Sequence, residues 1–523
     1  MKKQIKSIVS IFAFMSLVGC TDNFENINDN PNNPVEVPTY GIFNYASKEV
    51  VGVNQRGSFG SARLILPWVQ YSAQRNYTEE DRFQFRVSTN NSIFNSYYRQ
   101  AKNFKDIIDL NTNPETAVTA ALYGNTDNQI ASSRIMLAYI FSNLVDMFGD
   151  VPYYSYGNQD ADFQALDLGN LTPKFASQEK IYTDLLEELK QASEQIDMNE
   201  GIFFNNQGDN LFQSPEKLKR FANSLRLRIA NRVKAVIPTA NAHIQDAIAS
   251  GVMLSNNDTV GLQYENNSVN PAPTYEAFFI DNRTDYTISK TFVDVMKGET
   301  SIYPVDPRLQ IFAAPVGVSK ANSLSNAYEP TDDLTKYQGM PYGIASGQTA
   351  TQRARASLYG NAIFRADYTE ILMEYAEVEF LLAEVNGWNQ TNYENGVRAS
   401  MERWGVDSAK IDTFIADLPA ASEETVITQK YMALFMQPYE AWAEYRRTGF
   451  PNFLIQPGGT GTAITPISGS LTYTFTPLED LTEMPTRVPY PLNQATLTPI
   501  QYNEAVQHMG PDTMDTKLIW DLN

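Results

Sequence analysis

The sequence predicts a mostly α-helical fold, in which helix pairs form a scaffold, long ordered loops connect them, and β-structure is minor. Several long segments place apolar side chains at helical spacing. Some of these segments follow one another after short turns, as in helical-repeat proteins. The region 255–365 is instead rich in Asn, Pro, Gly and Tyr, which is typical of ordered loops.

The apolar spacing places the helices along the chain. We predict them at residues 91–110, 128–148, 177–196, 214–236, 368–385, 392–404 and 423–447. Segment 128–148 is apolar on much of its circumference, which predicts a central helix, and Gly149 followed by Pro152 ends it. Ser177 and Ser214 are suitable N-caps. The run 470–475 (SLTYTF) is a peripheral β-prone segment.

Composition excludes several classes of function. The chain has 523 residues, of which 43% are hydrophobic, so it can bury a large core. One cysteine excludes an internal disulfide, and with His243 and His508 as the only histidines a His-rich or Cys/His zinc site is excluded. We assign no metal ligands and expect no cofactor, and a metal ion bridging ligand and loop stays open. The formal net charge of −20 argues against nucleic acid as a partner.

The N-terminus has the pattern of a bacterial lipoprotein signal. Lys2, Lys3 and Lys6 precede an apolar stretch at residues 8–18, which is too short to span a bilayer. The sequence LVGC at residues 17–20 resembles a lipobox. We therefore predict a signal peptide over residues 1–19, lipid attachment at Cys20, and a polar tether over residues 20–38 that leads into a single domain at residues 39–523. An ordinary secretory peptide is the alternative.

Three stretches in the second half of the chain carry a family resemblance. They are residues 370–384 (EILMEYAEVEFLLAE), 440–451 (EAWAEYRRTGFP) and 485–491 (PTRVPYP). With residues 148–153 (FGDVPY) and 306–309 (DPRL), they resemble, in the same order, the SusD/RagB family of outer-membrane nutrient-binding lipoproteins. The resemblance is closest to the subgroup with the YAEVEFLLAE and WAEYRRTGFP signatures.

This resemblance implies a fold and a function. The fold would be a SusD-like α-helical scaffold of tetratricopeptide-like helix pairs with long loops as the binding face. The protein would be lipid-anchored on the outside of the outer membrane. There it would capture oligosaccharides without catalysis and pass them to a SusC-like TonB-dependent transporter. Some family members take oligopeptides instead. The abundance of Tyr, 29 residues, agrees with sugar binding, because sugar rings stack on aromatic faces.

The signature motifs contain carboxylates and arginines that could be catalytic or structural. Paired acids such as Glu370 and Glu374, or Glu377 and Glu384, could form a general acid/base site. We favour a structural network in which these acids pair with arginines such as Arg446, Arg447 or Arg487. Arg446 and Arg447 precede Gly449 in a predicted helix terminus with Trp442, and Trp520 is predicted to dock on the core; the structural set is Glu374, Glu377, Trp442, Arg446, Arg447 and Arg487.

Ligand contacts are expected on two loop regions. In the family they lie after the early helices and in the mid-chain insertion, which here are residues 68–77 (WVQYSAQRNY) and 264–343. The candidate ligand-binding residues are Trp68, Arg75, Tyr77, Tyr275, Tyr337 and Tyr342. Because Trp68 and Tyr71 are three residues apart beside Pro67, both could equally be core residues of one helix.

Two other classes of function stay open at this point. A surface glycosidase or peptidase would turn over its substrate and would depend on a carboxylate pair. A purely structural envelope lipoprotein would have neither a ligand nor a transporter partner.

Overall fold

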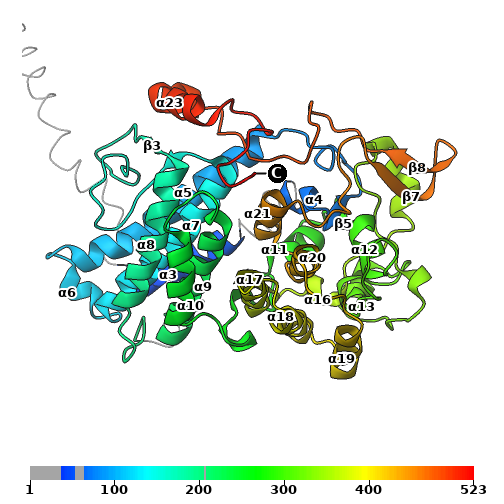
Figure 1. The fold of residues 1–523 in the computed structure, drawn as a ribbon, viewed down its shortest axis with the longest axis horizontal. Coiled ribbons are helices and arrows are strands. Elements are labelled where there is room, and N and C mark those ends of the chain that lie inside the picture. Colours follow the sequence, from blue (N-terminus) through cyan, green and yellow to red (C-terminus); the bar gives the residue numbers. More distant parts are fainter. Residues whose placement is uncertain (1–36, 53–63, 205–207, 523) are drawn as a thin grey trace, which may run out of the picture.

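The computed structural model describes residues 37–52, 64–204 and 208–522, and it confirms the mostly helical fold (Figure 1). The predicted signal peptide, Cys20 and the tether up to residue 36 lie outside these ranges. The first described helix is α3, and it begins at Thr39.

A first group of helices stacks in chain order. It consists of α3 (Thr39–Val51), α5 (Val87–Thr112), α6 (Ala117–Ala120), α7 (Thr126–Phe148), α8 (Gln178–Gln195), α9 (Pro215–Val233) and α10 (Ala240–Ser250). Helix α5 packs on α7, α7 on α8, α8 on α9 and α9 on α10 (left half of Figure 1). Helix α7 is buried along almost its whole length, as predicted for a central helix. Ser177 and Ser214 cap α8 and α9 as expected.

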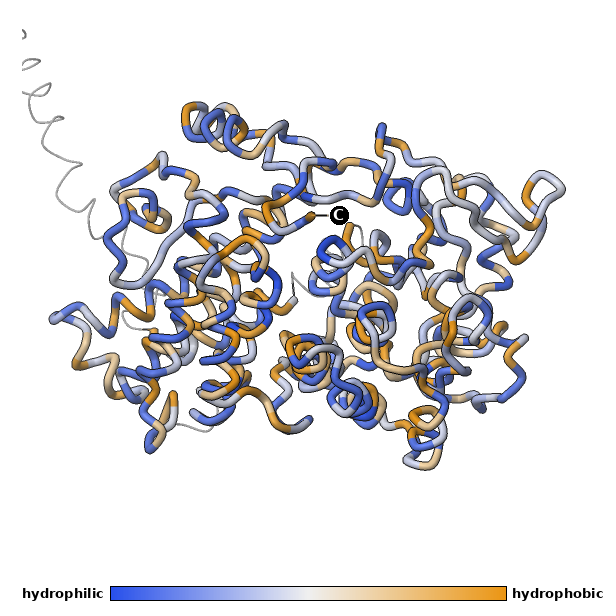
Figure 2. Tube along the Cα trace, in the orientation of Figure 1, coloured by the Kyte–Doolittle hydropathy of each residue, from blue (hydrophilic) through white to orange (hydrophobic). Residues whose placement is uncertain are grey.

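A second group of helices carries the signature motifs. It consists of α17 (Tyr375–Val385), α18 (Gln390–Arg403), α19 (Ser408–Ala416), α20 (Glu423–Ala433) and α21 (Pro438–Thr448). Helix α17 packs on α18 and α20, and it also contacts α9, which joins the two groups. Hydrophobic and hydrophilic residues are interspersed along these helices (Figure 2). Among the described residues, no helix combines the length and apolar character needed to cross a bilayer.

The rest of the described chain contains only short elements. The strands form four antiparallel pairs: β1 (Ser72–Gln74) with β5 (Tyr286–Ile288), β2 (Val151–Pro152) with β3 (Phe175–Ala176), β4 (Val260–Gln263) with β6 (Thr369–Met373), and β7 (Thr460–Ile467) with β8 (Ser470–Thr474). The remaining helices are α4 (Ile65–Trp68), α11 (Pro273–Tyr275), α12 (Lys290–Met296), α13 (Leu309–Phe312), α14 (Lys320–Leu324), α15 (Thr349–Arg353), α16 (Asn361–Phe364), α22 (Gln494–Leu497) and α23 (Pro499–Met509). Several of them lie in region 255–365, which the sequence predicted to be mostly loop.

The predicted helix at residues 368–385 is wrong in its first third. Residues 369–373 form strand β6, which pairs with β4 more than 100 residues earlier in the chain. Glu374 then becomes the N-cap residue of α17. A long-range backbone pairing therefore overrides the local helical spacing, and Glu370 and Glu374 are not one helical turn apart.

The predicted helix at residues 423–447 is two helices. The chain leaves the helical path after α20, and Met436 adopts a φ of +68°. Pro438 then occupies the first turn of α21. Proline disfavours a helical conformation at the preceding residue, here Gln437, so the break has a local cause.

The C-terminal segment returns to the first group of helices. Trp520 is buried, as predicted, and its indole donates a hydrogen bond to the Tyr182 hydroxyl on α8 at 2.6 Å. Helix α23 is held against the start of β2 by His508, whose Nδ1 lies 2.7 Å from Oδ2 of the buried Asp150. The other carboxylate oxygen of Asp150 accepts the backbone N–H of Gln178 at 3.0 Å.

The Asp150 contact predicts a pH-dependent contribution to stability. Burial raises the pKa of Asp150 to about 6, although His508 opposes the shift. The folded state therefore binds the proton of Asp150 more tightly than the unfolded state does. The stabilisation that results is fully present below about pH 4 and is lost as the pH rises through about 6. We expect the melting temperature of Asp150→Asn, relative to wild type, to increase between pH 4 and 7. The exposed Asp515→Asn is the control, and a constant difference across this range would contradict the assignment.

Candidate functional site

The ends of two paired strands bring together the most exposed predicted ligand residue and a group of polar side chains. In the antiparallel pair of β1 with β5, Gln74 lies opposite Tyr286. The chain that leaves β1 therefore runs beside the chain that enters β5, and the backbone N–H of Arg75 donates to the carbonyl of Asp285 at 2.5 Å. We call residues 75–77, 283–285 and Arg353 of α15 the rim site.

The backbone on the β1 side of the rim site is fixed by buried polar contacts. The buried carboxylate of Asp81 accepts the N–H of Gln74 at 2.8 Å. One residue beyond Tyr77, the N–H of Thr78 donates to the Ser346 hydroxyl at 3.1 Å. These contacts hold the loop on both sides of its exposed tip, so the rim site is preorganised.

Side-chain hydrogen bonds link the three segments of the rim site. The amide of Asn76 donates to Oδ1 of Asp285 at 3.0 Å, and Arg283 donates to the other oxygen of Asp285 at 2.9 Å. Arg353 donates to the side-chain oxygen of Asn76. Tyr77, the next residue along the chain from Asn76, has 62% of its surface exposed. An exposed aromatic side chain in the same loop as amide, carboxylate and guanidinium groups is the combination that a sugar ring and its hydroxyls require.

Arg75 is the half-buried cation of the rim site. Its guanidinium reaches only backbone carbonyls, those of Thr284 at 3.4 Å and Arg353 at 3.5 Å. Burial lowers the pKa of Arg75, and the nearby charge of Arg353 lowers it further, while Asp285 raises it. Arg75 thus feels the charges of both Arg353 and Asp285.

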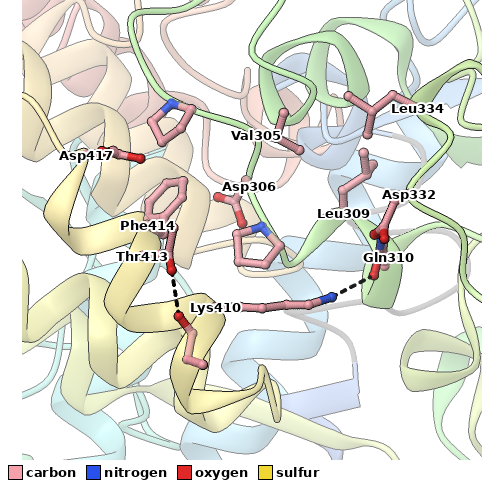
Figure 3. A pocket seen from close by; sticks show the side chains of 13 residues that line it. Val305, Asp306, Leu309, Gln310, Asp332, Leu334, Lys410, Thr413, Phe414 and Asp417 are labelled. Atoms are coloured by element: carbon pink, nitrogen blue, oxygen red, sulfur yellow. Dashed lines mark hydrogen bonds between the residues drawn. The ribbon is translucent and has the colours of Figure 1, made fainter.

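A groove of about 370 Å³ lies between α13 and α19 (Figure 3). Val305, Leu309 and Leu334 contribute apolar surface, and Lys410 reaches across toward Gln310 at 3.4 Å. Its aromatic residue, Phe414, is only 3% exposed and so offers no open ring face. None of the predicted ligand residues lines the groove, and we therefore take the rim site as the candidate binding site.

The carboxylates of the signature motifs have structural partners, as the favoured interpretation predicted. Glu377 forms a two-oxygen contact with Arg228 of α9, at 2.6 and 2.5 Å. Glu384 pairs with the predicted partner Arg447 at 2.8 and 2.7 Å. Glu374 pairs with Arg403 and accepts a hydrogen bond from Gln437 at 3.0 Å. Glu374 and Glu377 are fully buried, which leaves no path for a substrate to these two acids.

The arginines of the motifs tie the helix ends to neighbouring segments. Arg446 donates to the carbonyls of Asp146 and Thr486, each at 2.8 Å, and lies 3.5 Å from the ring centre of Trp442. Arg487 donates to the carbonyl of Phe148 at 2.8 Å and pairs with Asp512 at 3.0 Å. Helix α21 ends at Gly449 with a φ of +74°, the left-handed C-cap that the sequence predicted.

Of the six predicted ligand residues, the rim site contains Arg75 and Tyr77. Tyr275 is half-buried on α11 and packs on Phe279 with ring centres 5.2 Å apart. The structure removes the other three from the candidate site because their side chains are buried. Trp68 packs on Trp442, Tyr337 accepts the N–H of Thr331, and Tyr342 packs on Phe475. For Trp68, the alternative of a core residue was the correct one.

Five rim-site residues were not predicted: Asn76, Arg283, Thr284, Asp285 and Arg353. Asn76 lies inside the stretch 68–77, and its neighbours Arg75 and Tyr77 were the signal that could have found it. Arg283 and Asp285 lie in the Tyr-rich region but are not aromatic. Arg353 comes from α15, and no local pattern connects it with Asn76, which is 277 residues away. Among the described residues, no cluster of three or more His, Cys, Asp or Glu side chains is placed to hold a metal ion.

Comparison with known families agrees with this architecture. Residues 31–473 match the family SusD-like_2, described as "Starch-binding associating with outer membrane". The chain belongs to this SusD-like family. It is thus a member of a family of binding proteins and not of enzymes. No curated protein matches the sequence significantly.

Solved structures share the SusD-like fold at low sequence identity. A chitin-binding protein is 23% identical, with a TM-score of 0.72, over 93% of this chain and 100% of that one. A SusD homologue from Bacteroides uniformis is 22% identical, with a TM-score of 0.69 and the same coverage of both chains. A chitin-binding SusD homologue from Flavobacterium johnsoniae is 24% identical, with a TM-score of 0.67, over 93% and 99% of the two chains. These likenesses establish the fold.

Proposed function

We propose that this SusD-like protein captures oligosaccharides at the rim site and delivers them to a SusC-like TonB-dependent transporter. It would do so from the outer face of the outer membrane, anchored by a lipid on Cys20. The observation that carries the ligand assignment is the exposed ring of Tyr77 beside Asn76, Asp285 and Arg353, in a chain whose family is described as starch-binding.

The geometry of the rim site favours a sugar over a peptide. A glycan needs a flat apolar surface with hydrogen-bonding groups at its edge, and Tyr77 with Asn76 and Asp285 provides both. An extended peptide would pair with an open strand edge, or would place its side chains in pockets. Strands β1 and β5 are only three residues long, so their edges offer little backbone for a peptide to pair with. An oligopeptide ligand is the second candidate, since the resemblance to the family includes peptide-binding members.

Two features support the surface location. The LVGC sequence before Cys20 has the form of a lipid attachment site, and the polar residues after it suit a tether. The family is described as associating with the outer membrane. A lipid-anchored binder that holds its ligand outside the cell needs a transporter for delivery, which is the role proposed for the SusC-like partner.

Glycan binding is expected to depend on Tyr77. We expect Tyr77→Ala to weaken glycan binding by about 30-fold, which corresponds to roughly 2 kcal/mol for an aromatic hot spot. Isothermal titration calorimetry with a glycan found by screening measures the effect. Tyr45→Ala, which removes another exposed tyrosine, 52% exposed on α3, is the matched control and should bind like wild type. Equal loss in both variants, or loss in neither, would contradict the assignment of Tyr77.

The transporter partnership needs a separate experiment. The lipidated protein should be isolated from native membranes under mild conditions, and a TonB-dependent barrel should be recovered with it. Cys20→Ser should release the protein from the membrane fraction. Isolation without any such barrel would contradict the delivery role while leaving glycan binding at the rim site intact.

A further inference from the structure

The rim site has more positive charge than its own acids neutralise. Within the rim site as defined, three guanidinium groups, those of Arg75, Arg283 and Arg353, are accompanied by one carboxylate, that of Asp285, which pairs with Arg283. Two acids follow in the same loop, but Glu79 accepts from the Ser346 hydroxyl and Asp81 from the N–H of Gln74. The whole chain has a formal net charge of −20, so this local excess runs against the overall composition. A random sample of this surface would instead contain more acids than bases.

The hydrogen bonds show which cations lack an acidic partner. Arg283 donates to Asp285, and the other oxygen of Asp285 is already held by Asn76. Arg353 reaches a neutral amide oxygen, and Arg75 reaches only two backbone carbonyls at long distances. Nε of Arg75 is buried without a hydrogen-bond partner. Within the described ranges, neither Arg75 nor Arg353 forms a salt bridge.

We propose that the oligosaccharide taken by the rim site is acidic, with a uronate carboxylate or a sulfate ester bound by Arg353 and Arg75 while a sugar ring stacks on Tyr77. This inference rests on the proposed glycan-binding function and narrows its substrate class. The planar guanidinium fork matches a carboxylate or sulfate group with two parallel hydrogen bonds. Recognition of neutral hydroxyls would need only amides and carboxylates, which Asn76 and Asp285 already supply.

The repulsion between Arg353 and Arg75 also favours an anionic ligand. Burial lowers the pKa of Arg75, and the nearby charge of Arg353 lowers it further. A bound anion would relieve this repulsion and give Arg75 and Arg353 a partner of opposite charge. The expected consequence is an affinity that falls as the salt concentration rises.

Matched pairs of glycans test the inference. A panel of acidic polysaccharides is compared with the same polymers after carboxyl reduction or desulfation, by affinity electrophoresis and then calorimetry on oligosaccharides. We expect each bound polymer to bind about tenfold more tightly in its acidic form, as one charge-assisted contact gives. Reduction removes carboxylates and desulfation removes sulfate esters, so the panel also tells a uronate from a sulfate ester.

Substitutions show which cation causes the preference for acidic glycans. Arg353→Gln should remove most of the preference for the acidic form, and Arg353→Lys should restore part of it. Lys410→Gln, at the groove between α13 and α19, removes the same charge elsewhere and should have no effect. Since Arg353 is exposed, the fold should tolerate these changes.

The outcomes separate the two claims. Equal affinity for acidic and neutral forms, or an acidic preference that Arg353→Gln does not alter, overturns the acidic-glycan inference and leaves the proposed function standing. No binding of any glycan, acidic or neutral, overturns both. A preference for acidic forms that disappears in Arg353→Gln supports the inference.

Discussion

Arg232→Ala is expected to destabilise the protein by about 3–5 kcal/mol, because it removes the nearest counter-charge of two buried carboxylates. Arg232 of α9 contacts Asp146 of α7 and both oxygens of Glu440 of α21, the latter at 2.5 and 2.6 Å. Its side chain is almost fully buried, so water cannot replace the lost contacts. Equilibrium urea unfolding, followed by circular dichroism, measures the change.

A surface ion pair provides the matched control for this prediction. Arg398 and Asp412 are 2.8 Å apart, with 39% and 66% of their side chains exposed. Arg398→Ala should change stability by no more than about 0.5 kcal/mol. If Arg232→Ala costs no more than this control, the ion pairs between α9 and α21 do not hold the two helix groups together.

Trp442→Ala is expected to cost a similar amount, about 3–5 kcal/mol, through the cavity that it leaves. Trp442 of α21 is fully buried and packs on Trp68 with ring centres 5.2 Å apart. Its indole N–H donates to the carbonyl of Pro485 at 2.8 Å, and the guanidinium of Arg446 stacks on its ring. The substitution therefore removes apolar contacts, one hydrogen bond and a cation–π contact together. Thermal unfolding and urea unfolding should both report the loss.

Trp388→Ala is the control for Trp442. Trp388 is only partly buried, beyond the end of α17, so its removal leaves a smaller cavity and should cost clearly less. Similar losses in the two variants would mean that the WAEYRRTGFP helix has no special part in stability.

Much of the helical scaffold could be predicted from residues that are close in sequence. The apolar surface of α7, the caps Ser177 and Ser214, and the left-handed Gly449 all depend on residues close in sequence, and the structure has each of them. Strand β6 could not be predicted in this way, because its conformation depends on pairing with β4. The break before Pro438 had a local signal that helical spacing on both sides concealed.

Less of the candidate site could be predicted from the sequence. Arg75 and Tyr77 are found by their loop position, but burial decides which aromatics can meet a ligand, and burial depends on the tertiary packing. Tyr337 and Tyr342 lie in a loop region and are nevertheless fully buried. Arg353 joins the rim site only because α15 is brought beside the end of β1.

Hydrogen–deuterium exchange with and without a saturating glycan tests the central claim most directly, because it maps the binding surface without any substitution. We predict slower exchange in peptides that cover residues 72–79 and 283–287, with little change in residues 304–310 and 408–417, which border the groove between α13 and α19. Protection confined to the groove, with none at residues 72–79, would contradict the rim site as the place where the ligand binds.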